Sequence, residues 1–222
     1  MKIASLISGG KDSLYATFIA MNYGWEITHL ISISPQKLSW MYHKENIEIM
    51  PSIAKAMDIP LLMKESRAEK EEELEDLKEL IKEARVEAVI SGAIASEYQR
   101  TRIEKICHEI NVKSFTPLWH KRQEELLKEM IHAGFEIIIT AVAADGMGEE
   151  WLGRKINEEC IEDLVELNEK YGINAAGEGG EYETMVLDCP LYKKRIEITK
   201  AEKIWDGSRG SYEIKEFKVV EK

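Results

Sequence analysis

A glycine turn near the N-terminus constrains the fold of this chain more than any other feature. The hexapeptide S-G-G-K-D-S at positions 8–13 follows an apolar run at 3–7 and opens an amphipathic stretch that contains Leu14, Phe18 and Ile19. This order predicts a strand, a glycine loop and a helix. Adjacent glycines let backbone N–H groups point toward one concave site, and the helix adds its first amides and the positive end of its dipole. We therefore expect a phosphate site at the first βα turn.

The side chains of the turn fit this interpretation, although a simpler one exists. Lys11 would add a positive charge, and Ser8 and Ser13 offer hydroxyls. The alternative is an ordinary loop with a helix cap, because Ser, Gly and Asp are common at helix starts. The segment matches neither the G-x-x-x-x-G-K-[ST] phosphate loop nor the dinucleotide pattern G-x-G-x-x-G.

Apolar runs alternate with helical patterns through the first part of the chain. Strands are predicted at 2–7, 27–33, 60–64, 88–91 and 112–115, and helices at 11–21, 46–57, 69–84, 98–110 and 121–133. This rhythm predicts a mainly parallel sheet with helices on both faces. In such sheets the ligand lies beyond the carboxyl ends of the strands, where the turn at Gly92 also falls. We expect Gly92 beside the ligand, because a side chain would obstruct close backbone approach.

A second, smaller α+β domain is predicted after Gly134, so the domains would be 1–133 and 134–222. A strand is expected at 135–143, then a loop rich in Gly, Asp and Glu at 145–153 and a helix at 158–171. β-like segments follow at 184–187, 195–199 and 212–219, with glycine turns at Gly207 and Gly210.

Composition limits the classes of function. The formal net charge of −11 argues against a protein that tracks nucleic acid over an extended surface, although a local basic groove stays open. The acidic stretch at 65–87 has helical apolar spacing, which predicts a solvated helix face with i,i+4 ion pairs. The three cysteines form no C-x-x-C pair, so no zinc ribbon is expected. With no signal peptide or membrane-length apolar run, we expect a cytoplasmic protein that contacts no membrane.

Residues 91–107, SGAIASEYQRTRIEKIC, form a second segment of interest. On a helix, Tyr98, Arg102 and Lys105 fall near one face. Arg100 and Arg102 could each reach an anion. A surface salt-bridge network is the alternative, and the placement directly after the fourth strand keeps a functional role open.

Residues 177–188, GEGGEYETMVLD, form a third segment. A hairpin turn could explain the glycines, but it does not explain the clustering of Glu178, Glu181 and Glu183. Carboxylates on a glycine-rich loop can bind a cationic substrate, hold magnesium or orient ammonia. A functional loop is therefore the favoured interpretation.

Taken together, these segments resemble the diphthine–ammonia ligase family. The hexapeptide at 8–13 resembles the pyrophosphate loop of ATP pyrophosphatases. The further matches are G-A-I-x-S-x-Y-Q-R-x-R-x-E-x-x-C, P-L-W at 117–119, W-L-G at 151–153 and G-E-G-G-E-Y-E-T-x-x-L-D-C-P-L. The resemblance implies an adenine nucleotide α-hydrolase-like (HUP, Rossmann-like) first domain and a substrate end in the second. The absence of the extra C-terminal domains of long eukaryotic members suggests the short archaeal type.

The resemblance also implies a reaction and its participants. ATP, with Mg²⁺ as its expected counterion, would activate the carboxylate of diphthine on elongation factor 2 as an acyl-adenylate. Ammonium would then supply the amide nitrogen, and AMP and pyrophosphate would be released. Two alternatives stay open, a tRNA-modifying ATP pyrophosphatase and a non-catalytic nucleotide-binding sensor, and so does a homo-oligomeric state.

The residues expected to carry this function fall into three sets, and the metal ligands are not identified. The nucleotide would be bound by Ser8, Gly9, Gly10, Lys11, Asp12, Ser13 and Gly92. Catalysis would involve Lys11, Asp12, Glu181 and Glu183. The substrate would meet Tyr98, Arg102, Glu178, Gly179, Gly180, Tyr182 and Thr184, with Tyr182 offering a cation–π contact to its trimethylammonium group.

Overall fold

The computed structural model describes residues 1–35, 47–66 and 70–222, and these divide into two compact units. The first spans Met1–Trp119 and the second His120–Lys222. The division falls earlier than the boundary expected at Gly134. The helix α5 (Gln123–His132) packs against α6 (Glu158–Tyr171), and the side chain of Gln123 accepts a hydrogen bond from the amide of Ala175. The last helix assigned to the first domain therefore belongs to the second unit.

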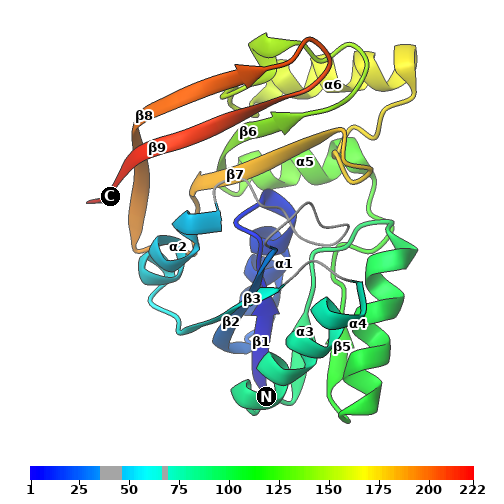
Figure 1. Cartoon of the computed structure of the whole chain (residues 1–222), viewed down its shortest axis with the longest axis vertical. Helices are drawn as coiled ribbons and strands as arrows, with labels where there is room; N and C mark the ends of the chain where they lie inside the picture. Colours follow the sequence, from blue (N-terminus) through cyan, green and yellow to red (C-terminus); the bar gives the residue numbers. More distant parts are fainter. Residues whose placement is uncertain (36–46, 67–69) are drawn as a thin grey trace. The chain divides into compact units, whose positions relative to one another are not determined.

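The first unit is built on a five-stranded parallel sheet with strand order β3-β2-β1-β4-β5 (Figure 1). This confirms the predicted parallel α/β architecture. Its strands are β1 (Lys2–Leu6), β2 (Glu26–Pro35), β3 (Leu61–Ser66), β4 (Ala88–Ile90) and β5 (Lys113–Phe115). Its helices are α1 (Lys11–Asn22), the 3₁₀ turn η1 (Ile47–Ile49), α2 (Met50–Met57), α3 (Lys70–Ala84) and α4 (Glu97–Glu109). The helix starts predicted at 46 and 69 lie outside the described residues.

Alternation along β1 places helices on both faces of this sheet, as predicted. Ala4 belongs to the core cluster that contains Ile31 of β2, Leu77 of α3 and Ile106 of α4. Ser5 points to the opposite face, where its hydroxyl lies 2.6 Å from that of Thr17 in α1. The sheet is therefore buried from both sides, which agrees with its continuous apolar strands.

The acidic helix α3 differs in part from the expected solvated face. Lys64 of β3 pairs with Asp76 at 2.7 Å, and Lys78 pairs with Glu109 of α4 at 2.6 Å. These pairs join α3 to neighbouring elements rather than following i,i+4 spacing. Glu73 is only 2% exposed, so the sequence pattern missed a buried carboxylate.

The second unit holds a four-stranded antiparallel sheet with strand order β7-β6-β9-β8. The predicted α+β character is confirmed. Its strands are β6 (Glu136–Val142), β7 (Tyr182–Asp188), β8 (Lys194–Trp205) and β9 (Gly210–Glu221), and its other element is the 3₁₀ turn η2 (Glu149–Trp151). Gly207 takes a φ of +100° in the turn between β8 and β9, a conformation that glycine adopts at low cost.

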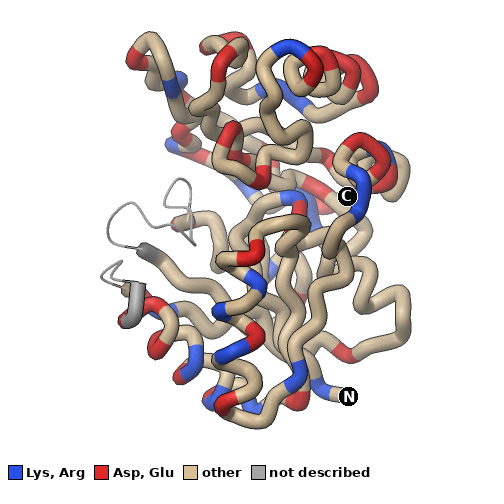
Figure 2. The backbone as a smooth tube through the Cα atoms, turned by 90° about the vertical axis from the view of Figure 1, so that its right-hand side faces the viewer, with Lys and Arg blue, Asp and Glu red and all other residues tan. Residues whose placement is uncertain are grey.

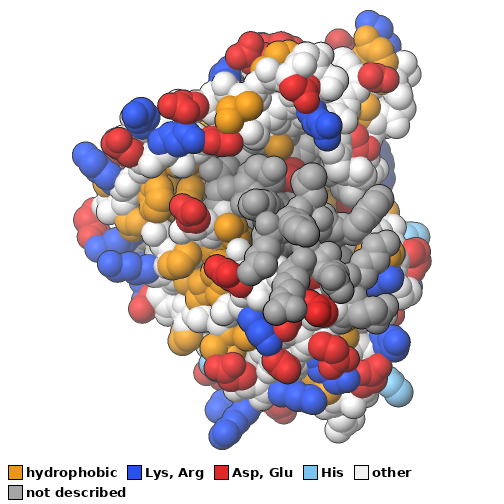
Figure 3. All heavy atoms as spheres, in the orientation of Figure 1, with side chains coloured by type: hydrophobic (Ala, Val, Ile, Leu, Met, Phe, Trp, Pro, Cys, Tyr) orange, Lys and Arg blue, Asp and Glu red, His pale blue; other side chains and the backbone are white. Residues whose placement is uncertain are grey.

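Charge is mixed over both units (Figure 2). On the face drawn in Figure 3, Lys and Arg side chains are interspersed with Asp and Glu rather than gathered into one basic stripe. None of the helices in the described ranges has the length and hydropathy needed to cross a membrane.

Candidate functional site

The glycine loop of the first unit is closed by one serine side chain. The hydroxyl of Ser13 accepts a hydrogen bond from the amide of Ser8 at 3.2 Å and donates to the carbonyl of Gly10 at 3.1 Å. Between them, Gly9 takes a φ of +80°, which a residue with a side chain rarely adopts. The loop is thus held in a compact turn directly after β1.

The start of α1 carries features that suit an anion. Its N-cap is Gly10, which has no side chain to cap the helix, and the first amides of a helix are suited to bind an anion. Lys11 is only 2% exposed, and its Nζ lies 2.9 Å from Oδ2 of Asp12. A cation and a carboxylate are therefore fixed together in the first turn of the helix.

Gly92 lies against the same turn from the adjacent strand. It follows β4, which pairs with β1 through Ser5 and Ile90. A Cβ at Gly92 would lie 2.6 Å from the nitrogen of Ser13 and 2.7 Å from the carbonyl carbon of Asp12. The structure therefore brings the two predicted glycine turns into direct contact, and only glycine fits at this point.

The helix α4 carries two arginines that stack on aromatic rings. The Arg102 guanidinium lies 3.6 Å from the centre of the Tyr98 ring. The Arg100 guanidinium lies 4.2 Å from the ring centre of Trp119, and it also pairs with Glu97 at 3.4 Å and with Glu104 at 3.7 Å. Tyr98 and Arg102 are thus brought together as the helical spacing indicates.

In the second unit, Glu181 anchors the glycine–glutamate loop. Its Oε1 accepts a hydrogen bond from the amide of Asn174 at 2.8 Å, and its backbone carbonyl accepts one from Ala143 at 2.8 Å. Its Oε2 is buried without a partner. One carboxylate oxygen therefore holds the loop, while the other keeps its capacity to accept a hydrogen bond.

Tyr182 has a supporting position in this loop. Its side chain is 3% exposed, and its hydroxyl donates to the carbonyl of Ala175 at 2.7 Å. A Cβ at Gly177 would lie 2.8 Å from its ring. Burial of the ring and use of its hydroxyl favour a positioning role for Tyr182 over the cation–π contact suggested by the sequence.

The remaining residues of the motif occupy two settings. Gly179 and Gly180 are exposed in the loop, where Gly180 has a φ of +87°. Glu183 and Thr184 lie in β7 and pair with Ala141 and Ile139 of β6. The motif is therefore a loop that leads into a strand, with Glu178 and Glu181 before the strand and Glu183 within it.

Sequence reasoning missed two residues that shape this loop. Gln123 accepts a hydrogen bond from the amide of Ala175 at 2.8 Å, and the side chain of Asn174 accepts one from Ala176 at 2.9 Å. Asn before a short loop is a known turn signal and could have been noticed. Gln123 lies more than fifty residues away, on α5, and no local pattern points to it.

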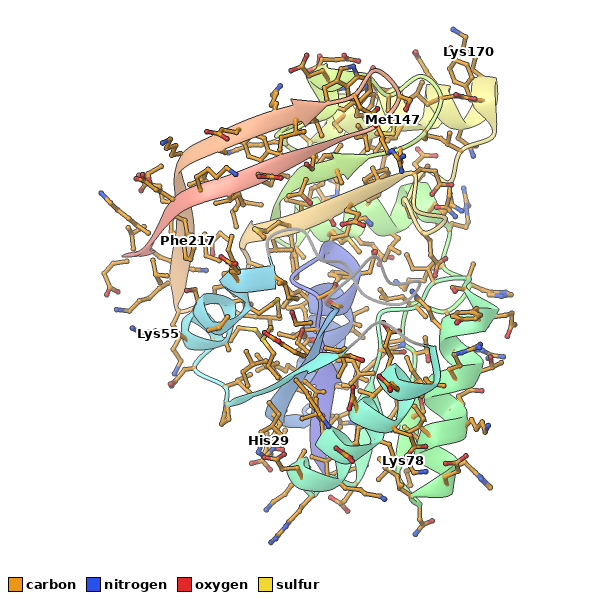
Figure 4. All side chains as sticks on the ribbon, viewed as in Figure 1. His29, Lys55, Lys78, Met147, Lys170 and Phe217 are labelled. Carbon is orange, nitrogen blue, oxygen red and sulfur yellow. The ribbon has the colours of Figure 1, made fainter. Side chains whose placement is uncertain are left out.

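The shorter motifs have packing roles in the structure. Gly153 takes a φ of +77°, and a Cβ there would lie 2.8 Å from the Tyr212 ring. Outside these motifs, in the loop that follows β6, Met147 is also buried, with 3% of its surface exposed (Figure 4). Leu118 is fully buried between the half-buried Pro117 and Trp119 of its motif. These residues support the unit that carries them.

Neither a metal centre nor a reactive cysteine is found among the residues that the structure describes. No group of three or more His, Cys, Asp or Glu side chains there could hold a metal ion. Burial raises the pKa of Cys107 and of Cys189 to about 12, and that of Cys160 to about 11. All three thiols are therefore protonated near neutral pH.

Two family models match the chain, one in each unit. The diphthamide synthase N-terminal domain matches residues 1–114, and the diphthamide synthase C-terminal domain matches residues 122–220. The chain belongs to the diphthamide synthase family. The match to the diphthamide synthase family confirms the resemblance drawn from the sequence motifs, and it covers the glycine loop of one unit and the glutamate motif of the other.

Curated relatives in the diphthamide synthase family carry one description. Diphthine–ammonia ligase of Rattus norvegicus is 38% identical over 92% of this chain and 85% of its own length. Diphthine–ammonia ligase of Schizosaccharomyces pombe is 38% identical over 94% of this chain, which spans only 38% of that relative. A solved structure described as a predicted subunit of tRNA methyltransferase, from Methanocaldococcus jannaschii, gives a TM-score of 0.46 at 16% identity over 86% of this chain and 98% of that one.

Proposed function

We propose that the chain joins ammonia to the carboxylate of diphthine on elongation factor 2 at the expense of ATP. The observation that carries this proposal is the match of both units to the diphthamide synthase family, whose curated members are diphthine–ammonia ligases. A ligase of this kind is an ATP-dependent, amide-forming enzyme. A cytoplasmic location follows from the proposed acceptor, because elongation factors act there.

The proposed amide formation has two steps. A carboxylate oxygen attacks the α-phosphorus of ATP, the bond to the β-phosphate bridge oxygen breaks, and pyrophosphate leaves. The nitrogen of NH₃ then attacks the carbonyl carbon of the acyl-adenylate, AMP leaves, and a proton is lost from nitrogen. The adenylate is needed because an unactivated carboxylate would have to expel oxide.

The first unit supplies the phosphate site in this proposal. The phosphates would bind at the start of α1. The turn that precedes it, at Ser8, Gly9 and Gly10, is held by the hydrogen bonds of Ser13. Lys11 adds a buried positive charge as the pyrophosphate leaves. Fixed dipoles and charges aimed at developing negative charge are among the largest contributions to catalysis.

Magnesium would bind at this site together with the nucleotide, with most of its ligands supplied by phosphates and water. The described residues contain no three-ligand cluster, so those residues form no closed metal cage. Mg²⁺ at nucleotide sites commonly takes most of its ligands from phosphates and water and only one or two from carboxylates. In this proposal Asp12 would be such a carboxylate, because it lies in the first turn of α1 beside Lys11.

The second unit supplies the acceptor and ammonia end. Glu178, Glu181 and Glu183 are carboxylates close together in sequence around exposed glycines, and they suit the trimethylammonium group of diphthine or an ammonium ion. In this proposal Glu181 orients the nitrogen, and the buried Oε2 of its carboxylate, which accepts no hydrogen bond among the described residues, supports that role. Tyr182 and Asn174 hold the loop in shape.

One assay tests the proposal. The purified chain is incubated with ATP, ammonium and elongation factor 2 that carries diphthine, and AMP and amidated factor are measured. Both products should form only when all three components are present. ATP binding without turnover would favour a nucleotide sensor, and AMP formation that depends on tRNA in place of the factor would favour a tRNA-modifying enzyme.

A further inference from the structure

We propose that Arg102 is an oxyanion-binding residue of the first unit. The oxyanion is either a phosphate of the nucleotide or the carboxylate of the acceptor, and this naming of its source rests on the proposed function. Arg102 is not part of the glycine loop at 8–13. It lies on α4, several residues after the second glycine turn at Gly92.

The geometry of α4 places the guanidinium at the ligand edge of the sheet. Side chains on a helix lean toward its N-terminus and reach the residue four positions earlier. Arg102 does this, with its guanidinium 3.6 Å from the centre of the Tyr98 ring. Tyr98 is the second residue of α4, so the charge lies at the first turn of the helix. That turn follows β4 and Gly92, which contacts the end of the glycine loop at Asp12 and Ser13.

The partners of Arg102 leave its charge available. Within the described part of the chain it forms no ion pair, and its Nε is buried without a hydrogen-bond partner. Arg100, two residues earlier, also stacks on an aromatic ring but is neutralised by Glu97 and Glu104. In a chain with 41 acidic and 30 basic residues, an arginine held in place yet lacking a carboxylate partner is suited to an external anion.

The stacking explains why an arginine is suited to this position. A flat guanidinium packed on a tyrosine ring keeps its charge and loses side-chain freedom before the ligand arrives. Its N–H groups point outward in the plane of the fork, the arrangement that binds phosphate or carboxylate oxygens in pairs. A lysine would retain the charge without this paired geometry.

Calorimetry on the full chain with three probes tests the proposal. Inorganic pyrophosphate, ATP and AMP are titrated into wild type, Arg102→Gln, Arg102→Lys and the matched control Arg100→Gln. If a phosphate is the ligand, Arg102→Gln should weaken pyrophosphate and ATP by about 10- to 100-fold, the cost of one charge-assisted hydrogen-bonded contact. Arg102→Lys should fall between it and wild type, and AMP should change little.

The carboxylate source gives a different result. Nucleotide affinities would stay at wild-type values, while KM for elongation factor 2 carrying diphthine would rise by a similar factor. The proposal is overturned if neither quantity moves, or if Arg100→Gln produces the same losses. The pyrophosphate titration uses no acceptor or ammonium, so it reports on Arg102 even if the chain fails to form the amide. Melting curves of each variant identify loss of fold, and Arg102→Lys retains the stacked charge if Arg102→Gln does not fold.

Discussion

Adding a single methyl group at Gly92 should impair the proposed phosphate site without removing any functional group. In Gly92→Ala the new Cβ would lie 2.6 Å from the nitrogen of Ser13, 2.7 Å from the carbonyl carbon of Asp12 and 2.8 Å from the Cα of Ser13. All three are backbone atoms, so no side chain can rotate away. Either the turn after β4 or the start of α1 must move.

The size of the effect follows from these distances. Restoring ordinary contact, at 3.4 Å or more, requires a displacement of about 0.8 Å at the closest atom. Displacements near 1 Å can cost on the order of a hundredfold in rate, and overpacking costs about 1–3 kcal/mol, or about 5- to 150-fold in an equilibrium. We expect Gly92→Ala to weaken ATP binding and to slow AMP formation by about 10- to 100-fold.

Gly24→Ala is the matched control in the same unit. Gly24 has a φ of +78° and nothing within 4 Å of its Cβ position. The substitution should therefore cost about 1 kcal/mol of unfolding free energy through backbone strain, with ATP affinity unchanged. The measurements are calorimetric titration with ATP and thermal unfolding. Wild-type ATP affinity in Gly92→Ala, or an equal loss in Gly24→Ala, would refute the reasoning from steric contact.

Three further predictions concern the charged groups and the nitrogen source. Lys11→Met, which keeps most of the side-chain length, should reduce ATP turnover by more than tenfold with a circular dichroism spectrum like that of wild type; undiminished turnover would exclude Lys11 from the phosphate site. Glu181→Gln should leave ATP affinity near normal and greatly reduce amide formation, whereas the exposed Glu197→Gln should change neither. Loss of ATP affinity in Glu181→Gln would instead assign the loop to the nucleotide. Since the three buried thiols stay protonated near neutral pH, no cysteine is poised to release ammonia from glutamine. Free ammonium should support the reaction, with a rate that rises with pH as the NH₃ fraction grows, and turnover with ammonium-free glutamine would contradict this.

The order of strands and helices could be predicted because each element carries its own local pattern. Apolar runs of strand length and helical apolar spacing predicted the strands and α-helices of the first unit, with most described ends displaced by one or two residues. The helix predicted at 46–57 is the exception, because the 3₁₀ turn η1 occupies its first part and α2 begins only at Met50. The division between the units could not be obtained in this way. Whether α5 packs against the parallel sheet or against α6 depends on contacts between residues far apart in sequence, such as the hydrogen bond between Gln123 and Ala175. Gly134 follows the end of α5 and does not mark the boundary between the units.

The glutamate motif shows the same limit at the level of a site. Its composition predicted carboxylates on a glycine-rich loop, but not which carboxylate oxygen is used in a hydrogen bond that holds the loop. That depends on Asn174, whose amide donates to Oε1 of Glu181. The backbone carbonyl of Glu181 is held separately by the amide of Ala143, next to the paired residues Val142 and Tyr182. Tyr182 likewise packs its ring directly against Gly177, where a Cβ would not fit. The motif contains both residues, but its sequence does not show that they are in contact.

The contrast between the two arginines of α4 was, however, present in the sequence. Positions three and four residues away along a helix are neighbours in space. For Arg100 these positions include Glu97 and Glu104, and the structure forms both pairs. For Arg102 they are Tyr98, Gln99, Lys105 and Ile106, none of which is acidic. A helix that neutralises one arginine twice and leaves the other on an aromatic ring has separated a structural charge from one available to a ligand, and the anion titrations measure that separation directly.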